Sequence, residues 1–310
     1  MIAFLFPGQG SQKVGMGKVL AEAHPVCRDT FAEADEALGQ RLSTLCFEGP
    51  EDQLVLTENT QPALLAVSVA MYRLLVQRGL APHFVAGHSL GEYSAHVAAG
   101  TLSFADALQV VRRRGRYMQD AVPVGAGAMA AILGLDEAQV EQACADAAQG
   151  DVVSPANINA PGQIVIAGSA AAVARAGERA KALGARRVIP LNVSAPFHCA
   201  LMRPAEERLG PELRALRAGD PGVPLVANVD AEVKRDAASS IEALVRQVSR
   251  PVRWEASMRR LASAGVRTYV EVGSGTVLSG LAKKIHPGAD VYSVDQHLGQ
   301  PALEALSTLP

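Results

Sequence analysis

Short apolar runs that stop at Gly-rich turns constrain this fold more than any other feature of the sequence. Residues 2–6 (IAFLF) lead directly into the turn PGQG, and residues 83–87 (HFVAG) lead into HSLG. Each run is too short for a helix and is typical of a buried strand that ends in a turn. Helical patterns follow, so the sequence predicts strands joined through helices, the arrangement of a parallel sheet.

Helical and strand patterns alternate along most of the 310 residues. Thr60 is expected to cap a helix that has Pro62 in its first turn and ends at Gly79. Ser103 and Asp106 form a start similar to a capping box, for a helix that continues to about residue 121. The other expected elements are helices at residues 90–99, 201–217, 277–285 and 299–306, and strands at residues 223–227 and 268–272.

The segment 123–191 has a different order of elements. Its pattern predicts a strand, a helix, two strands, a helix and a final strand, at residues 127–133, 136–147, 152–158, 163–167, 170–183 and 186–191. This β-α-β-β-α-β order is that of a ferredoxin-like unit. We therefore predict an α/β protein whose large domain, residues 1–122 and 192–310, carries a small α+β subdomain inserted at residues 123–191.

Charge and composition exclude several classes of protein. The 29 basic and 31 acidic residues give a net charge of −2, which does not suit bulk binding of nucleic acid. The most apolar long stretch, residues 62–76, is too short and too polar to span a membrane. The apolar start of the chain lacks basic residues and is not a signal peptide. Four scattered cysteines, with no metal-binding or redox pair among them, indicate a reducing cytoplasm.

The strongest chemical motif is GHSLG at residues 87–91, which has the GxSxG pattern of a nucleophile elbow. Its place between an expected strand and an expected helix puts the Ser89 hydroxyl at the tip of a tight turn. The helix N-terminus there would offer amide donors to an oxyanion. In a chain with 28 glycines the pattern also arises by chance, so the strand–turn–helix context carries the interpretation.

A serine nucleophile needs a base. His198 lies in a Pro-containing loop before an expected helix and is the favoured candidate, although a single histidine is more often structural. His88 adjoins Ser89 but is expected to point away from it, and His96 lies two turns into the next helix. No acidic residue has a motif that marks it as partner of the base, so a dyad with a backbone carbonyl fits equally well. The acidic candidates are Asp151, Asp230 and Asp295.

Four motifs occur in the order seen in one family: FPGQGSQ at residues 6–12, GHSLGE at 87–92, APFHC at 195–199 and EVGSG at 271–275. On these motifs the whole chain resembles the malonyl-CoA:acyl-carrier-protein transacylases of type II fatty acid synthesis. The resemblance implies a hydrolase-like large α/β domain with a ferredoxin-like insert. The chain departs from the pattern at Ser274, where many members have proline, away from the expected chemistry.

The resemblance also implies roles for individual residues. Ser89 matches the nucleophile that carries the acyl group, and His198 matches the general base. Gln247 matches the residue whose main-chain carbonyl orients the histidine. The backbone amides of Gln9 and Leu90 match the oxyanion donors. These assignments would explain why no acidic partner of the base is marked by a motif.

Two further residues bear on the substrate. Arg114 matches the arginine that binds the free carboxylate of the malonyl group. It belongs to a cluster of arginines on one expected helix; most such charges are solvated, but an inward one can hold a carboxylate through two parallel hydrogen bonds. Phe197, beside His198, is expected either to leave little room for an α-methyl branch or only to pack.

The resemblance therefore implies an S-malonyltransferase that works through a malonyl-serine intermediate and supplies fatty acid synthesis. Its partners would be malonyl-CoA and acyl carrier protein, with no metal, because the coenzyme A thioester is substrate rather than cofactor. We expect a cytoplasmic monomer. The alternatives are a trans-acting acyltransferase of a polyketide pathway, a serine thioesterase or esterase with the same elbow, and a non-catalytic scaffold descended from the family.

Overall fold

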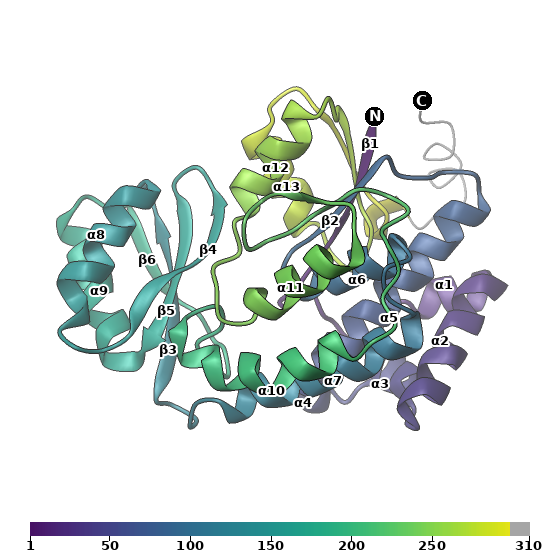
Figure 1. Ribbon diagram of the computed structural model, residues 1–310, viewed down its shortest axis with the longest axis horizontal. Coiled ribbons are helices and arrows are strands. Elements are labelled where there is room, and N and C mark those ends of the chain that lie inside the picture. The colour runs from purple at the N-terminus through teal and green to yellow at the C-terminus, as the bar shows by residue number, and fades with distance from the viewer. Residues whose placement is uncertain (298–310) are drawn as a thin grey trace.

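The computed structural model describes residues 1–297 and contains two β-sheets. Figure 1 shows the smaller sheet with α8 (Glu137–Ala148) and α9 (Ala170–Ala182) as a lobe beside the larger, helix-covered sheet. A parallel sheet with a second, antiparallel sheet confirms the expected fold class. The helix expected at residues 299–306 lies outside the described residues.

The larger sheet has six strands in the order β10-β9-β1-β2-β7-β8. Neighbouring strands from β10 to β7 are parallel, and β8 pairs antiparallel with β7. The carboxyl ends of parallel strands lie along one edge of a sheet, and this edge is where α/β proteins bind ligands. The strands are β1 (Ile2–Phe6), β2 (Phe84–Gly87), β7 (Leu225–Val226), β8 (Val233–Lys234), β9 (Thr268–Glu271) and β10 (Asp290–Ser293).

Helices cover both faces of the larger sheet. Those of the large lobe are α1 (Lys18–Ala23), α2 (Pro25–Leu38), α3 (Leu42–Glu48), α4 (Glu51–Leu54), α5 (Thr57–Gln77), α6 (Leu90–Ala98), α7 (Phe104–Asp120), α10 (Arg203–Arg214), α11 (Ala237–Gln247), α12 (Trp254–Ser263) and α13 (Val277–Ile285). Short 3₁₀ turns lie at Ala200–Met202 and Asp295–His297.

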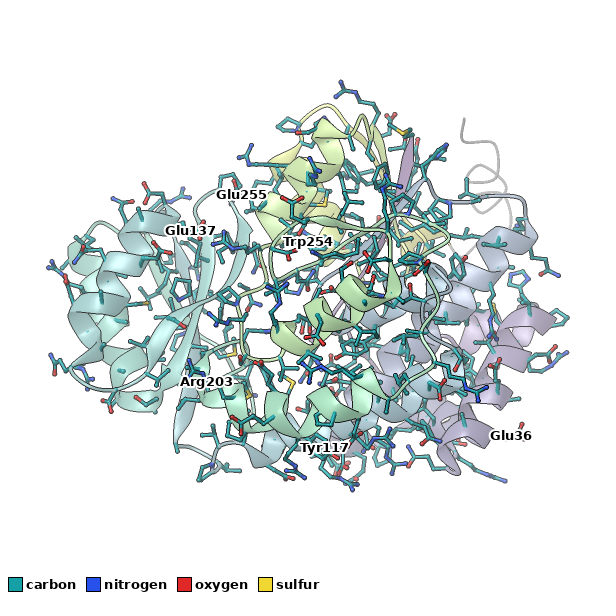
Figure 2. The ribbon with its side chains drawn as sticks, viewed as in Figure 1. Glu36, Tyr117, Glu137, Arg203, Trp254 and Glu255 are labelled. Carbon is teal, nitrogen blue, oxygen red and sulfur yellow. The ribbon has the colours of Figure 1, made fainter. Side chains whose placement is uncertain are left out.

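Strand β1 separates two apolar cores because its side chains alternate between the faces of the sheet. Phe4 and Phe6 belong to the core that α5, α6 and α7 fill from one side. Ala3 and Leu5 belong to the core on the other side, which α12 and α13 fill. Figure 2 shows Trp254, a member of this second core, at the start of α12.

The smaller sheet is antiparallel, with strands in the order β4-β5-β3-β6. Helix α8 lies between β3 and β4 in the sequence, and α9 lies between β5 and β6, which gives the β-α-β-β-α-β order that the sequence predicts. One face of this sheet forms a third core with α8 and α9. The domain boundaries at residues 123 and 191 stay a prediction. The strands are β3 (Gly127–Leu133), β4 (Val153–Ala160), β5 (Gln163–Ser169) and β6 (Arg187–Pro190).

The two lobes are joined by backbone hydrogen bonds as well as by packing. The Val252 amide donates to the Ala156 carbonyl at 2.9 Å, and the Ile158 amide donates to the Val252 carbonyl at 2.9 Å. Glu137, at the edge of the small lobe, lies 3.6 Å from Arg253, next to the start of α12 (Figure 2). Strand β4 is therefore tied to the segment that follows α11.

Two expected helices have different limits in the structure. Helix α5 begins at Thr57, so Thr60 is inside it and not its cap; the Thr60 hydroxyl donates to the Leu54 carbonyl instead. Pro62 lies near the start of α5 and lacks an amide hydrogen, so the helix loses one hydrogen bond there. The apolar packing of α5, which is buried along most of its length, offsets this loss. The helix expected at residues 201–217 is a 3₁₀ turn followed by α10, which ends at Arg214.

Candidate active site

Ser89 lies at the sharp turn between β2 and α6. Its backbone has φ 52° and ψ −108°, a conformation that residues other than glycine rarely adopt and that is held only by its surroundings. A Cβ atom at Gly91 would lie 1.9 Å from the Phe6 carbonyl oxygen, and one at Gly87 would lie 1.9 Å from the Gly91 carbonyl oxygen. The two glycines of the motif are therefore required by close backbone packing around the serine.

Asn228 holds this turn from the neighbouring strand. It follows β7, and its side chain accepts from the Ser89 amide at 2.8 Å and donates to the Gly87 carbonyl at 2.7 Å. It is completely buried. Asn228 was not predicted from the sequence, although a polar residue directly after the strand expected at residues 223–227 was an available signal.

His198 accepts a hydrogen bond from the Ser89 hydroxyl. Ser89 Oγ and His198 Nε2 are 2.7 Å apart, and His198 Nδ1 is 3.0 Å from the Gln247 main-chain oxygen. A carbonyl oxygen can only accept, so Nδ1 carries the hydrogen and Nε2 is free to act as the base.

The acidic residues considered as partners of the base form ion pairs elsewhere. Asp151 pairs with Arg175, Asp230 with Lys234 and Arg246, and Asp295 with Lys13.

The environment of His198 keeps its imidazole neutral. The side chain is buried, and burial together with the charge of Arg114 lowers the pKa of His198 to about 3. Near neutral pH the ring is therefore unprotonated, the form that a general base must have before it acts. His88, as expected, makes its contact away from the serine: its Nε2 is 2.9 Å from Asn159 Oδ1 on β4.

Arg114 is the arginine of its cluster that points into the protein. It is 1% exposed, and its guanidinium donates to Gln61 Oε1 at 2.8 Å, Gln247 Oε1 at 2.9 Å and Ser89 Oγ at 3.1 Å. The central carbon of its guanidinium, Cζ, lies 5.4 Å from the centre of the Tyr93 ring. Within residues 1–297 no carboxylate forms an ion pair with Arg114, so the groups that accept its hydrogen bonds are all neutral. Its more exposed neighbours Arg113 and Arg116 pair with Glu212 and Glu58.

A pocket of about 570 Å³ opens onto these groups. Gln9 and Phe197 line it, whereas Leu90 lies behind Ser89 as the first residue of α6. The first amides of a helix have no partner within the helix, so the Leu90 N–H is available to an oxyanion. The turn that carries Gln9 packs against the elbow, because a Cβ at Gly8 would lie 2.4 Å from the His88 carbonyl oxygen.

Both lobes contribute to the pocket. The large lobe supplies the nucleophile, the base and Arg114, and the small lobe supplies Met129 and Asn157. The remaining walls come from the turn between α4 and α5, from α5 and α7 themselves, and from the chain between the lobes. The lining residues on these walls are Val55, Leu56, Gln61, Met118, Gln119, Leu191, Asn192, Val193 and Ser194.

Within residues 1–297, no group of three or more His, Cys, Asp or Glu side chains is placed to hold a metal ion. None of the helices described is long and apolar enough to cross a membrane.

The fold and the site geometry are those of α/β proteins that carry a serine on a nucleophile elbow. Residues 3–294 match the model of the acyl transferase domain, and the chain belongs to that family. It is 53% identical to the malonyl CoA-acyl carrier protein transacylase of Escherichia coli K12, over 91% of this chain and 92% of the relative. The enzyme of the same name from Bacillus subtilis is 52% identical, over 92% and 90%.

Solved structures agree with this assignment. An acyl carrier protein S-malonyltransferase from Vibrio cholerae superposes with a TM-score of 0.95 at 48% identity, covering 98% of this chain and 99% of the other. A malonyl-transacylase solved in complex with a type II polyketide acyl-carrier protein also has a TM-score of 0.95, at 47% identity and 98% coverage of each chain.

Proposed function

We propose that this protein transfers the malonyl group from coenzyme A to the pantetheine thiol of acyl carrier protein, through a malonyl ester on Ser89. The observation that carries the proposal is the buried guanidinium of Arg114, 3.1 Å from Ser89 Oγ and without a carboxylate partner in residues 1–297. A buried charge without a counter-charge is costly, and a substrate carboxylate would supply that counter-charge. An ester or thioester with an uncharged acyl group would not.

The first half-reaction follows from the distances at Ser89. His198 Nε2 takes the hydroxyl proton as Oγ attacks the thioester carbonyl, and the amides of Gln9 and Leu90 stabilise the oxyanion. The carbon–sulfur bond then breaks, and the coenzyme A thiolate takes the proton from His198. The thioester is already activated for acyl transfer, so this step needs no resident cofactor.

The second half-reaction reverses the first with a different thiol. The pantetheine thiol of the carrier protein gives its proton to His198, its sulfur attacks the malonyl ester, and Ser89 Oγ leaves with the proton. Arg114 holds the malonyl carboxylate throughout. Phe197 is proposed to limit the space beside the α-carbon, where one methyl group changes selectivity by about 1–3 kcal/mol.

The working environment is proposed to be the cytoplasm, where the carrier protein and coenzyme A thioesters would meet the enzyme. All four cysteines, Cys27, Cys46, Cys144 and Cys199, are buried and free, which is typical of a reducing compartment. The Escherichia coli relative is named for an acyl carrier protein, and one of the similar solved structures holds a type II polyketide carrier protein. The fatty acid role is the one we propose here.

Mass spectrometry of the intact protein tests the proposal directly. Malonyl-CoA should add one malonyl group to the wild type, and acyl carrier protein should then remove it and become malonylated. Ser89→Ala should not be labelled. Labelling of Ser89→Ala at full stoichiometry would refute the nucleophile assignment. Loss of the label to water rather than to the carrier would identify a thioesterase.

Arg114→Ala tests the carboxylate role separately. Losing one partner of a buried charge pair costs roughly 2–5 kcal/mol, so malonyl transfer should fall by about thirtyfold or more. Transfer of an acetyl group, which has no carboxylate, should fall much less. Arg113→Ala, a neighbour on the same helix that pairs with Glu212, is the control. Equal losses for the two acyl groups would exclude this role.

A further inference from the structure

The side chain of Gln247 connects three groups of the site. Its Oε1 accepts from Arg114 at 2.9 Å, and its Nε2 donates to the Ser89 carbonyl at 2.9 Å and to Glu92 Oε2 at 2.7 Å. The side chain is completely buried. These contacts are separate from the main-chain carbonyl of Gln247, which meets His198.

Glu92 determines which way the Gln247 amide faces. Its Oε2 also accepts from the Asn228 amide at 3.1 Å, so this oxygen is an acceptor and the amide must present its N–H side to it. Burial raises the pKa of Glu92 to about 7. In the protonated form the hydrogen would occupy Oε1, which is buried and has no hydrogen-bond partner among the described residues, and Oε2 would still accept.

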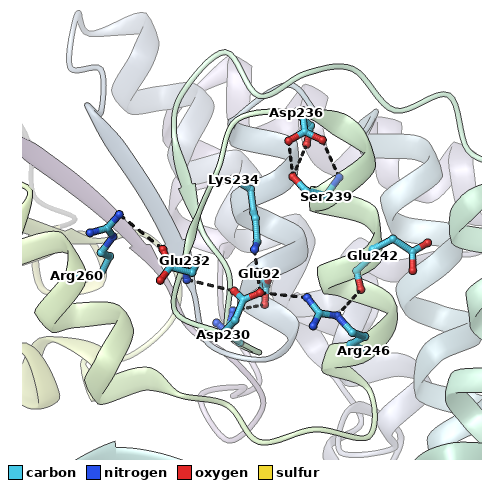
Figure 3. A network of polar contacts seen from close by, with 10 residues as sticks. Glu92, Asp230, Glu232, Lys234, Asp236, Ser239, Glu242, Arg246 and Arg260 are labelled. Carbon is cyan, nitrogen blue, oxygen red and sulfur yellow. Dashed lines mark hydrogen bonds and ion pairs between the residues drawn. The ribbon is translucent and has the colours of Figure 1, made fainter.

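Among the described residues, no surface cation forms an ion pair with Glu92. Figure 3 shows it beside Asp230, whose carboxylate is already bound by Lys234 at 2.8 Å and by Arg246 at 3.1 Å. Lys234 and Arg246 therefore bind Asp230 and not Glu92. The contacts that Glu92 makes are those to the Asn228 amide and to Gln247, which point towards the active site.

The orientation of the Gln247 amide determines which N–H groups of Arg114 are left for a ligand. Gln61 and Gln247 each take one N–H, from different terminal nitrogens of the guanidinium. Each terminal nitrogen keeps one further N–H, and one of these is on Ser89 Oγ in the free protein. Two N–H groups on two nitrogens match the two oxygens of a carboxylate. Because amide oxygens are neutral, they orient the guanidinium without cancelling its charge.

We propose that Glu92 and the side chain of Gln247 are positioning residues that set Arg114 for the carboxylate of the acyl group. Glu92 fixes the amide of Gln247, and the amide oxygen in turn fixes the guanidinium. If the side-chain amide of Gln247 rotated by half a turn, its N–H groups would face the N–H groups of Arg114. Both are donors, so no hydrogen bond could form between them. This inference rests on the proposed function, because it concerns the carboxylate of the malonyl substrate.

Volume-matched variants separate this role from simple support of the fold. Gln247→Met keeps the main-chain carbonyl that orients His198 but removes the amide. Glu92→Met removes the acceptor that orients the amide. Each should lower kcat/KM for malonyl-CoA about tenfold relative to acetyl-CoA, mainly through a higher KM for malonyl-CoA, because one charge-assisted contact loses its alignment. Acylation of Ser89 by acetyl-CoA, measured as intact mass, shows that the site is still assembled.

A conservative variant and a control complete the test. Glu92→Gln can place its amide oxygen where Oε2 lies, so it should restore the malonyl preference to within a few fold of the wild type. Glu271→Met is the control, because Glu271 is a buried carboxylate that instead accepts from the Leu278 and Ser279 amides of α13. It is expected to reduce stability and leave the ratio of malonyl to acetyl transfer unchanged.

The outcomes distinguish the inference from the proposed function. Equal losses for both acyl groups in Gln247→Met, or a failure of Glu92→Gln to restore the ratio, would overturn the positioning role while wild-type malonylation stands. Absence of malonyl-Ser89 in the wild type would overturn the proposed function itself. If Glu92→Met does not fold, Gln247→Met decides, since it leaves the contact between Glu92 and Asn228 in place.

Discussion

At the scale of single residues, the site combines a neutral base with a cation that has no carboxylate in direct contact within residues 1–297. His198 and Arg114 are both buried and both hydrogen-bond to Gln247, one to its main-chain oxygen and one to its side chain. Each also contacts Ser89 Oγ. The charge of Arg114 therefore acts on the basicity of His198 as well as on the substrate.

Removing the charge of Arg114 should change the pH dependence of acyl transfer. Arg114 is one cause of the lowered pKa of His198, so Arg114→Ala should raise that pKa. The base must be neutral to act, and the acidic limb of the profile should therefore move to higher pH. Acetyl-CoA is the substrate to measure, as kcat/KM against pH, because it makes no ion pair with Arg114. An unchanged limb, or a shift to lower pH, would contradict the prediction; Arg113→Ala is the control.

His96 is a second buried histidine, with no catalytic contact. Neither ring nitrogen has a hydrogen-bond partner among residues 1–297, and burial lowers its pKa to about 3 from 6.5. The unfolded chain therefore binds a proton at His96 that the folded protein does not, as pH falls from about 6.5 towards 3. This histidine contributes a loss of stability over that range.

His96→Leu should therefore stabilise the protein, and more so at acidic pH. Removing an unpartnered buried imidazole should raise the free energy of unfolding by roughly 1–3 kcal/mol near neutral pH, and the gain should grow below pH 6.5. Urea denaturation at several pH values, compared with the wild type, measures both parts. A gain that is the same at every pH would show that His96 has the same pKa in the folded protein as in the unfolded chain, and would contradict the prediction.

At the scale of elements, the elbow depends on three backbone segments that approach one another closely. Gly91 of α6 touches the end of β1, and Gly87 of β2 touches α6. The positive φ of Ser89 is possible because Asn228, from the far side of β2, fixes the amide and carbonyl groups around it. The backbone strain at Ser89 therefore arises where β2 meets α6, and Asn228, which follows β7, stabilises it.

Gly91→Ala should disrupt this boundary. Its Cβ would overlap the Phe6 carbonyl oxygen, which is strand backbone and cannot move without breaking the pairing of β1 with β2. We expect a loss of roughly 3 kcal/mol or more in unfolding free energy and loss of Ser89 acylation. Gly280→Ala in α13 is the matched control, because its Cβ meets nothing within 4 Å. It should stabilise by about 0.5–1 kcal/mol; similar effects of the two changes in chemical denaturation would refute the argument.

Local signals explain which elements could be predicted from the sequence. The strands expected at residues 2–6 and 83–87 and the Ser103 cap depend on neighbouring residues, and the structure has them as β1, as β2 and at the start of α7. The contacts of Gln61, Glu92 and Gln247 with Arg114 or with each other join residues more than 50 positions apart. Their pattern depends on how α5, α6, α7 and α11 pack, and a single sequence does not contain that information. The role of the Gln247 carbonyl came from family resemblance rather than from pattern.

At the scale of the whole molecule, the pocket lies between two lobes that share one apolar interface. One face of the small sheet, including Ala156, Val165 and Ala167, belongs to the main core of the large lobe, and the other face has its own core with α8 and α9. The connection at Val252 lies five residues after Gln247, whose carbonyl orients His198. We propose that the lobes meet as separate folding units, with boundaries near residues 123 and 191, so that their contact sets the position of the base.

Hydrogen exchange of the native protein tests this division. The amides of Val252 and Ile158 form the bonds between the lobes, and the amide of Val272 bonds to Leu5 within the large sheet. If the lobes can separate without unfolding, Val252 and Ile158 should exchange together, with an opening free energy below that of Val272, which should require global unfolding. Equal opening free energies for all three amides would mean that the chain unfolds as one unit. The ion pair between Arg253 and Glu137 is partly exposed and contributes little to the contact between the lobes. Glu137→Gln should therefore change the difference in opening free energy between Val252 and Val272 by no more than about 0.5 kcal/mol.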